Sequence, residues 1–332
     1  MDVHGLAPSG RMMQIAESHQ RRVRSQLRRS QPSANSRQRR TTHWQLALSL
    51  ALASSGLAAV PSAVASSAGA PTSARCGTLR AVPSYHHVVW ILMENEGYGN
   101  IIGSPDAPYL NGLATSCGLA SNYAAISHPS LPNYIALTSG STQGITDDGE
   151  PSTHRLGAAS IFSQLGGNWR ALEESMPMSC DRVTSGDYAA RHNPAVYYTD
   201  LATTCPKDDV PLRQPLDLSA AFTFITPNIC DDMHSCPVAT GDAWLSRFIP
   251  QILNSALYRA NSTVLFITFD EGTTASNTVP TIIVAPSVPR ALRVASAYTH
   301  YSLLRTAEQL LKLAPLGAAA RAPSMLAAFH LS

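Results

Sequence analysis

Short apolar segments of strand length alternate with helix-like segments along most of the chain. Continuous apolar runs occupy residues 87–93, 263–269 and 279–285, and a shorter run occupies 222–226. Such runs are typical of strands covered on both faces, because a strand with one solvent-facing side alternates apolar and polar residues. The spacing of apolar residues predicts helices over 107–115, 132–137, 160–165, 244–257 and 300–313. The alternation predicts a three-layer α/β/α fold with a mostly parallel central sheet.

The beginning of the chain has a different pattern. Nine arginines and only two acidic residues lie within the first 40 positions, and the apolar run 46–60 and the small residues Ala63-Val64-Ala65 follow. A basic segment, a short apolar run and a small-residue cleavage site are typical of a signal peptide. An uncleaved membrane anchor is the alternative. We predict a basic leader and signal peptide (1–65), a flexible lead-in rich in Ala, Ser, Gly and Pro (66–84) and a single domain (85–332).

The charge of the chain changes when this leader is set aside. The whole chain has 24 basic and 22 acidic residues, whereas without the nine arginines and two acids it has 15 and 20, a net charge of −5. This balance argues against nucleic acid as a partner. With the signal peptide, it favours a secreted or cell-envelope-associated protein with no stable membrane insertion after cleavage.

All six cysteines follow the proposed cleavage site, which favours disulfides in an exported chain. Six cysteines allow about 15 connectivities, so the sequence leaves the pairing open. Sequence order suggests three bridges: Cys76 with Cys117, Cys180 with Cys205, and Cys230 with Cys236. A zinc site is disfavoured, because no pair has the C-x2-C spacing.

Polar residues follow three of the predicted strands: Glu94-Asn95, Asp270-Glu271, and Asn228 with Asp231, Asp232 and His234. Functional groups gather at the carboxyl ends of strands in such folds. Taken alone, the first pair fits a helix cap and the second a turn. Acidic neighbours directly after a buried strand are costly unless they are paired or liganded, which favours one divalent metal ion. Oxygen and imidazole donors suit Mg, Mn, Ca, Zn or Fe without choosing among them.

Ser130 lies in the segment His128-Pro129-Ser130-Leu131-Pro132, at the start of a predicted helix. A serine at this position is ordinarily a helix cap. A helix N-terminus also attracts phosphate through its free N–H groups and its dipole, so a nucleophile placed there would meet an oriented substrate. Ser130 is thus a candidate for both roles.

Four histidines stand beside turns, prolines or acidic residues: His128, His192, His234 and His300. Imidazole titrates near neutral pH and binds metals. These positions are therefore candidates for metal ligation, phosphate contact or proton transfer, with a structural role as the alternative for each.

At these residues the sequence resembles the bacterial and fungal phosphoesterase family, which contains acid phosphatases and phospholipases C. Five blocks carry the resemblance in order: HVVWILMENEGYGNIIG, SNYAAISHPSLPNYIALTSG, TPNICDDMHSCPVATGDAWL, FITFDEG and YTHYSLLRTAEQL. They extend over residues 86–311 and are most similar to secreted acid phosphatases of the mycobacterial type. One departure is Leu131, where an acidic residue commonly stands.

The resemblance implies an alkaline phosphatase-like fold and a metal-assisted serine nucleophile. By motif it implies that Ser130 is the nucleophile, with further catalytic roles for Asn95, His128 and His300. It places His192 and His234 at the substrate phosphate. The implied metal environment consists of Glu94, Asn95, Ser130, Asp270 and Glu271.

We therefore predict a secreted, metal-dependent acid phosphatase that hydrolyses phosphate monoesters, phosphoinositides included, through a phosphoserine intermediate. Its substrate would be a small phosphoester or a phospholipid headgroup. Two alternatives stay open: a phospholipase C-type phosphodiesterase, and a secreted binding protein that has lost catalysis. The absence of a long aromatic-rich or amphipathic insert favours monoesters. Retention of Asn95, Ser130, Asp270 and Glu271 argues against lost catalysis.

Overall fold

The computed structural model describes residues 76–332. The predicted leader and signal peptide, and residues 66–75 of the predicted lead-in, lie outside the described residues. None of the helices from Cys76 onward combines the length and the apolar character of a bilayer-spanning segment.

A single nine-stranded sheet forms the centre of the described part, in the spatial order β4-β3-β5-β1-β6-β7-β2-β8, with β9 also paired to β2. Neighbouring strands are parallel except around β7, which is antiparallel to both β6 and β2. The strands are β1 (His87–Met93), β2 (Gly118–Ala124), β3 (Trp169–Glu173), β4 (Asp209–Pro211), β5 (Phe222–Thr226), β6 (Thr263–Phe269), β7 (Thr278–Val284), β8 (Leu292–Val294) and β9 (Tyr298–Thr299).

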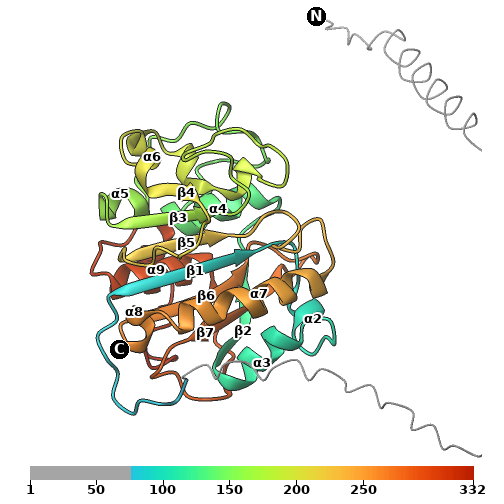
Figure 1. The fold of residues 1–332 in the computed structure, drawn as a ribbon, viewed down its shortest axis with the longest axis vertical. Coiled ribbons are helices and arrows are strands. Elements are labelled where there is room, and N and C mark those ends of the chain that lie inside the picture. The colour runs from blue at the N-terminus through green and yellow to red at the C-terminus, as the bar shows by residue number, and fades with distance from the viewer. Residues whose placement is uncertain (1–75) are drawn as a thin grey trace, which may run out of the picture. The chain divides into compact units, whose positions relative to one another are not determined.

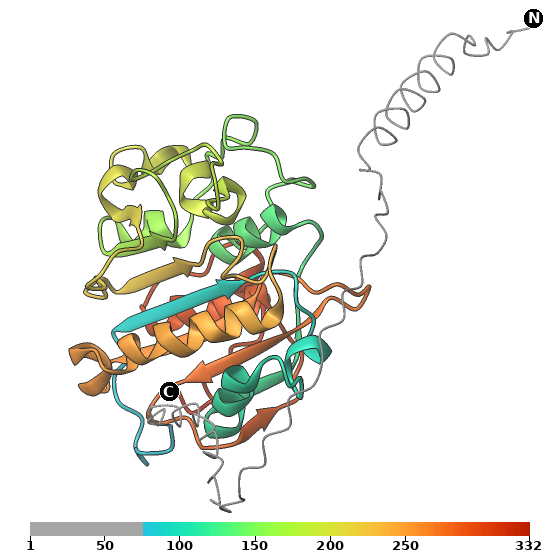
Figure 2. The same ribbon diagram turned by 45° about the vertical axis from the view of Figure 1, so that its right-hand side comes forward.

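Helices cover both faces of the sheet (Figures 1 and 2). Helix α7 lies on one face with α3 packed against it, and α4 packs against α9 on the other. The α-helices are α2 (Tyr98–Ile101), α3 (Pro108–Ser116), α4 (Ser130–Ser139), α5 (Ile161–Leu165), α6 (Cys205–Asp208), α7 (Val238–Leu253), α8 (Ala256–Arg259) and α9 (His300–Leu310). The 3₁₀ helices are η1 (Ala190–His192), η2 (Pro194–Tyr197), η3 (Thr199–Leu201) and η4 (Gly317–Arg321). The predicted three-layer fold with a mostly parallel sheet is confirmed.

All four apolar runs are strands. β1, β5 and β6 have the predicted bounds, and β7 begins and ends one residue before its prediction. β2 and β3 were not predicted from the pattern, since their sequences GLASNYA and WRALE contain small, polar or charged residues. In β3, Arg170 is accommodated by ion pairs to Asp208 and Asp217. Because these partners lie far along the chain, the local pattern of apolar and polar residues does not show that Arg170 belongs to a strand.

The prediction of one helix over 244–257 is wrong in its bounds. Helix α7 begins at Val238, directly after Pro237, in a stretch of small residues without an apolar period. It ends at Leu253, and the Ser255 side chain accepts a hydrogen bond from the Tyr258 amide to start the separate helix α8. The other four predicted helices correspond to α3, α4, α5 and α9.

The three suggested disulfides are present: Cys76–Cys117, Cys180–Cys205 and Cys230–Cys236. The first ties the beginning of the described chain to the end of α3. The Thr78 and Leu79 amides also donate to the Pro286 carbonyl oxygen, each at 3.1 Å. Residues 76–84, predicted as part of a flexible lead-in, are therefore anchored to the domain, because composition carries no information about distant tethers.

Candidate active site

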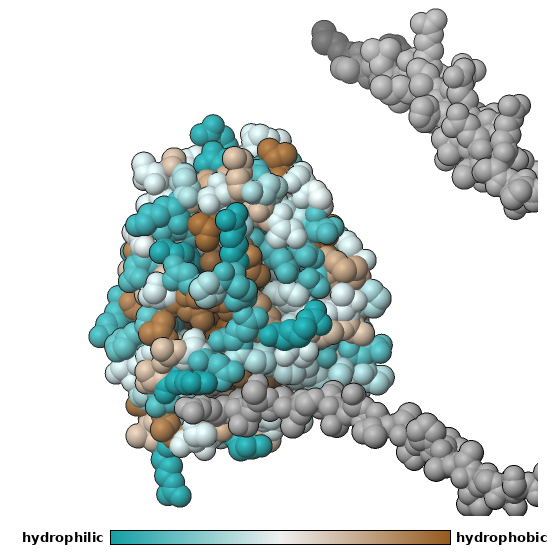
Figure 3. Space-filling view, in the orientation of Figure 1, coloured by the Kyte–Doolittle hydropathy of each residue, from teal (hydrophilic) through white to brown (hydrophobic). Residues whose placement is uncertain are grey.

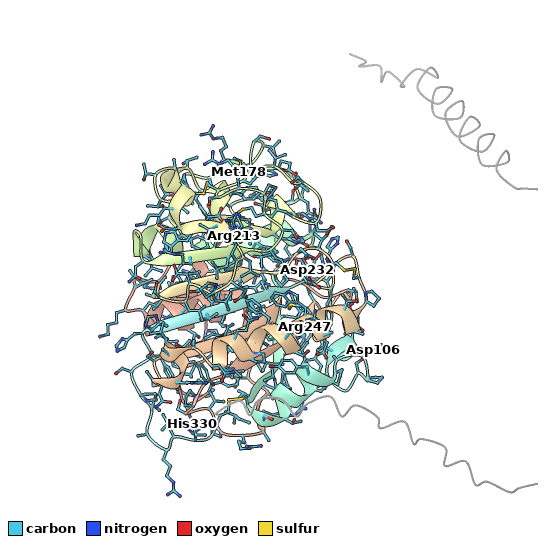
Figure 4. All side chains as sticks on the ribbon, viewed as in Figure 1. Asp106, Met178, Arg213, Asp232, Arg247 and His330 are labelled. Carbon is cyan, nitrogen blue, oxygen red and sulfur yellow. A yellow bond between two sulfur atoms is a disulfide. The ribbon has the colours of Figure 1, made fainter. Side chains whose placement is uncertain are left out.

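Three neighbouring strands bring acidic side chains to one edge of the sheet. Met93 and Phe269 pair at the ends of β1 and β6, so Glu94 and Asp270 leave the sheet side by side. Asp232 follows β5, the strand on the other side of β1, and its carbonyl oxygen accepts a hydrogen bond from the Glu94 amide at 2.8 Å. Figure 4 labels Asp232 beside the carboxyl ends of these strands. All three acidic side chains are buried.

These carboxyl groups are held in an environment that disfavours their charge. Burial is the main cause and raises the pKa of Asp232 and of Asp270 to about 8. Burial also raises the pKa of Glu94 well above its usual value, and repulsion from Asp270 and Asp232 adds to the effect. No lysine or arginine of the described chain forms an ion pair with any of the three. The cluster therefore lacks a compensating permanent cation.

Glu94 is the centre of a hydrogen-bond network. Its Oε2 accepts from the Ser130 hydroxyl at 2.9 Å and from the Asn95 side-chain amide at 3.0 Å. Its Oε1 accepts from the Tyr134 hydroxyl at 2.5 Å. Asp270 Oδ1 accepts from the Asn95 backbone amide at 3.0 Å. Ser130 and Asn95 thus both lie at the carboxylate cluster.

Ser130 is the first residue of α4, and it is not the helix cap. The N-cap position is Pro129, which makes no side-chain capping bond, and the Ser130 hydroxyl turns to Glu94 instead. The next amide, that of Leu131, donates to the Asp148 carboxylate at 3.0 Å. One of the helix N–H groups that we expected to be free for a phosphate therefore already binds an anionic side chain.

The aromatic side chains of His192 and Tyr134 face the acidic cluster. His192 Nε2 lies 3.4 Å from Glu94 Oε1, and His192 Nδ1 lies 3.2 Å from Asp232 Oδ2. Its ring stacks on Tyr134 with centroids 5.3 Å apart. Burial lowers the pKa of His192 well below its usual value, and the charge of Arg191 lowers it further. A neutral imidazole between two carboxylates is suited to metal ligation.

His234 stands farther out, beside Arg191. The Arg191 guanidinium lies 3.1 Å from His234 Nε2 and 3.9 Å from a carboxylate oxygen of Asp148. Burial and the charge of Arg191 lower the pKa of His234. Both predicted phosphate-site histidines, His192 and His234, therefore line the same wall, with rings 5.6 Å apart.

The donor atoms of the cluster fit a bound cation. Four buried atoms lack a hydrogen-bond partner in the described chain: both ring nitrogens of His192, Asp232 Oδ2 and Asp270 Oδ2. Ligand atoms of Glu94, His192 and His234 lie within 4.8 Å of one another. Unpaired buried acceptors are costly, and a divalent cation with oxygen and nitrogen ligands would satisfy them.

Glu271, which was expected at the metal, has a different partner. Its Oε2 lies 2.5 Å from His128 Nδ1, and the His128 side chain is 49% exposed. Burial, with repulsion from Asp148, raises the pKa of Glu271 to about 7. The pair lies at the rim of the cluster, since Glu271 follows Asp270 directly and His128 is half-exposed. Repulsion from the Glu271 carboxylate also contributes to the raised pKa of Asp270.

His300 differs from its expected catalytic role. Its Nε2 lies 2.6 Å from the Asp270 carbonyl oxygen and its Nδ1 lies 3.0 Å from the Tyr123 hydroxyl. Both ring nitrogens are engaged, the side chain is fully buried, and burial lowers its pKa to about 4. His300 therefore positions the Asp270 backbone and offers no nitrogen to a substrate.

Three residues of this site were not among the predicted site residues. Asp232 was only one of several polar residues that follow a predicted strand, and Arg191, directly before His192, was not singled out. Tyr134 carried a usable signal, since it lies four residues after Ser130 and so on the same helix face. No local spacing could show that Asp232 and His192 meet.

Solved structures share the fold of this chain. The chain is similar to an alkaline phosphatase superfamily protein from Vibrio parahaemolyticus, with 11% identity and a TM-score of 0.50 over 72% of this chain and 69% of that chain. It is also similar to the lipoteichoic acid synthase LtaP of Listeria monocytogenes, with 10% identity and a TM-score of 0.50 over 72% and 74% of the two chains. The fold is that of the alkaline phosphatase superfamily.

Within that class, the chain belongs to the phosphoesterase family, whose sequence model matches residues 103–314. It is 34% identical over 251 residues to the phosphatidylinositol-3-phosphatase of Mycobacterium tuberculosis, covering 73% of this chain and 82% of the relative. It is 31% identical over 219 residues to the phosphate-repressible acid phosphatase of Penicillium chrysogenum, covering 59% and 52% of the two. The chain thus spans about half the length of this fungal relative. The predicted family and enzyme class, a hydrolase of phosphoric ester bonds, are confirmed.

Proposed function

We propose that the protein is a metal-dependent phosphomonoesterase of the acid phosphatase type, acting through a phosphoserine formed on Ser130. The observation that carries the proposal is the Ser130 hydroxyl. It lies 2.9 Å from Glu94 inside a cluster of buried carboxylates in which Asp232 Oδ2 and Asp270 Oδ2 accept no hydrogen bond from the described residues. A serine in this setting is oriented toward charged groups and away from its own helix backbone.

The chain's own residues account for the transfer of the phosphoryl group. The Ser130 oxygen bonds to phosphorus, the bond from phosphorus to the ester oxygen breaks, and the serine proton passes to Glu94 along their hydrogen bond. Water then bonds to the phosphorus of the phosphoserine and gives a proton to the group that protonated the departing alcohol. The bond to Ser130 breaks, the serine oxygen takes its proton back from Glu94, and phosphate leaves. Asn95 and Tyr134 keep the Glu94 carboxylate in place during both steps.

The departing alcohol requires a proton, and the rim of the site has a suitable donor. His128 is half-exposed and is held by Glu271. An imidazole fixed by a carboxylate at the mouth of a site is well placed to protonate a leaving oxygen. Arg191 and His234, on the opposite wall, would contact the phosphate oxygens, where a guanidinium forms charge-assisted hydrogen bonds.

Asp232, Asp270, His192 and Glu94 are the residues that would hold one divalent cation. When bound, such a cation supplies Lewis-acid stabilisation of the phosphoryl oxygens and of the serine oxygen. Of the metal environment expected from the sequence, Glu94 and Asp270 keep this role, and Asn95 and Ser130 stay next to it. In this proposal Asp232 and His192 take the place of Glu271, because His192 contacts both Glu94 and Asp232, whereas Glu271 is paired with His128.

The relatives support a monoester substrate. Their names include phosphatidylinositol-3-phosphatase and acid phosphatase. A small phosphoester or the headgroup of a phosphoinositide would therefore be the substrate. Three disulfides in the described chain agree with an exported protein, as the signal peptide predicted from the sequence implies.

The test replaces Ser130 with alanine. We expect the wild type to hydrolyse p-nitrophenyl phosphate faster than bis-p-nitrophenyl phosphate, and Ser130→Ala to lose about a thousandfold or more in kcat. Acid-quenched wild-type enzyme should carry phosphate on the peptide that contains Ser130. Elemental analysis of the purified protein should find one divalent metal ion per chain, retained by the variant.

Ser127→Ala is the matched control, because this hydroxyl bonds only to the neighbouring His128 carbonyl oxygen, at 3.1 Å. We expect it to keep nearly full activity. Substantial turnover by Ser130→Ala would contradict the serine nucleophile, and preference for the diester would contradict a monoesterase.

A further inference from the structure

A cavity of about 480 Å³ opens at a place that the hydrolytic site does not use. It lies between the segments 150–155, 182–183 and 196–199, which belong to the green and yellow part of the chain at the top of Figure 1. Its volume is within the range of small-molecule binding sites, about 300–1,000 Å³. No residue of the carboxylate cluster lines it.

The walls of this cavity are mostly apolar. Val196, Tyr197 and Pro151 are buried lining residues. The Tyr197 hydroxyl donates to the Gly149 carbonyl oxygen at 2.9 Å, and the hydroxyl of Tyr198, another lining residue, lies 2.7 Å from Thr138 Oγ1. Both tyrosine hydroxyls therefore have hydrogen-bond partners outside the cavity lining, and the rings contribute apolar surface to the cavity.

An exposed apolar side chain stands at the edge of the same cavity. Val183 lines it and is 65% exposed. Within residues 76–332, only Val183 and Met178 are large hydrophobic side chains with such exposure, and both lie in the segment between β3 and η1. Figure 4 labels Met178 at the top of the molecule. Apolar surface gathered in one segment beside a cavity is typical of a binding site.

Two cations border the cavity without protein partners. Arg155 and Arg182 line it, are exposed, and make no hydrogen bond or ion pair to any side chain in the described part of the chain. The one acidic lining residue, Glu150, accepts a hydrogen bond from the Thr184 amide at 3.4 Å. By contrast, Arg170 is paired with two aspartates. The two guanidinium groups are thus available to an anion.

We propose that this cavity binds an anionic amphiphile, whose apolar chain lies against Val196, Val183 and the tyrosine rings and whose anionic group binds Arg155 and Arg182. An apolar interior beside two unpaired guanidinium groups matches a lipid with a charged headgroup better than it matches a simple anion or a neutral hydrocarbon. The proposal concerns binding and stands apart from the proposed hydrolysis.

The site is also connected to helix α4. The segment that supplies Glu150, Pro151 and Arg155 begins with Asp148, whose carboxylate binds the Leu131 amide beside Ser130. A ligand in the cavity would therefore contact the same segment whose Asp148 binds the N-terminus of α4.

The test is a calorimetric titration of the full chain with dihexanoyl phosphatidylglycerol below its critical micelle concentration. This lipid is a phosphodiester, so a monoesterase leaves it intact. We expect saturable binding to the wild type, and about tenfold or more weaker binding to the Arg155→Ala/Arg182→Ala double variant. Zwitterionic dihexanoyl phosphatidylcholine should bind to the wild type about as weakly as dihexanoyl phosphatidylglycerol binds to the double variant. Val183→Ser should weaken binding by about threefold, through lost apolar contact.

Arg213→Ala is the matched control. Arg213 is exposed and lines a separate depression of about 290 Å³. Figure 4 labels it on the face that Figure 3 shows, where apolar and hydrophilic side chains are mixed. This variant should bind the lipid like the wild type. Unchanged affinity in the double variant, no saturable binding by the wild type, or full displacement of the lipid by inorganic phosphate alone would each overturn the proposal. Loss of phosphatase activity in Ser130→Ala would leave lipid binding unchanged.

Discussion

Several carboxyl groups of the described chain are buried, and two groups of them compensate for burial in different ways. Beside the active site, Asp270 Oδ2 has no partner within the described residues, which suits a cation. Next to β3, Asn193 Nδ2 donates to both oxygens of Asp209, at 3.1 and 3.0 Å. Thr226 Oγ1 donates to Glu173 at 3.2 Å. The carboxyl groups of Asp209 and Glu173 thus accept hydrogen bonds from neutral donors, so they need no bound ion.

Asp209 makes the stability of the chain depend on pH. Burial raises its pKa from the usual 3.8 to about 7. Between these two values the folded chain binds more protons than the unfolded chain, so the free energy of unfolding falls as pH rises through this interval. In Asp209→Asn we expect this fall to be smaller by about 1–3 kcal/mol. Urea unfolding at about pH 4, 5.5 and 7 measures it.

Asp200→Asn, at an exposed position, is the control and should keep the pH dependence of the wild type. The same dependence in Asp209→Asn would show that the buried pair is not responsible.

Helix α4, which presents Ser130 at its first turn, is locked in place at its other end. Its C-cap is Gly140, with φ of 72°. A Cβ atom there would lie 2.2 Å from the Leu316 carbonyl oxygen, and the Gly140 carbonyl oxygen accepts from the Ala318 amide at 2.8 Å. The segment after α9 therefore packs directly on the end of α4, and only glycine fits at the contact.

Gly140→Ala tests this contact. The substitution adds both a positive-φ strain and a backbone collision, so we expect it to lower the free energy of unfolding by about 3 kcal/mol or more. Gly144→Ala is matched in backbone conformation, with φ of 77°, but has no atom within 4 Å of the added Cβ. It should cost only about 1 kcal/mol. Equal losses in chemical denaturation would mean that the contact with Leu316 yields easily.

At the scale of the whole molecule, two of the disulfides have different roles, one in stability and one in the geometry of the active site. Cys76–Cys117 spans 41 residues and ties down the start of the described chain, whereas Cys230–Cys236 spans 6 residues and encloses Asp232 and His234. Loop closure predicts about 4 kcal/mol for the longer bridge and about 2 kcal/mol for the shorter one. The shorter bridge therefore matters more for geometry than for stability.

We expect Cys230→Ser/Cys236→Ser to lose about tenfold or more in kcat/KM, because Asp232 loses its fixed position, while its unfolding temperature falls by less than that of Cys76→Ser/Cys117→Ser. Cys76→Ser/Cys117→Ser should show the reverse, with a clearly lower unfolding temperature and nearly full activity per folded molecule. Thermal unfolding and p-nitrophenyl phosphate turnover measure the two effects. Full activity without the shorter bridge would contradict its positioning role.

Much of the architecture could be predicted from local sequence patterns. Continuous apolar runs have no stable place except between two layers, so β1, β5 and β6 could be read directly, and their polar ends marked the edge where Glu94 and Asp270 lie. The motif around Ser130 was sufficient to connect that serine with the carboxylates. These features are local, or follow from a single rule of parallel sheets.

Only the tertiary structure decided which other side chains join them. The order β5-β1-β6 places Asp232 beside Glu94, and the packing of η1 against α4 brings His192 to both carboxylates, although the three residues are far apart in the chain. The same packing turns Glu271 toward His128 and buries His300 behind the Asp270 backbone. Residue type and spacing are the same for a ligand and for a structural histidine. The difference is which neighbours the fold supplies, and that depends on distances that no local pattern contains.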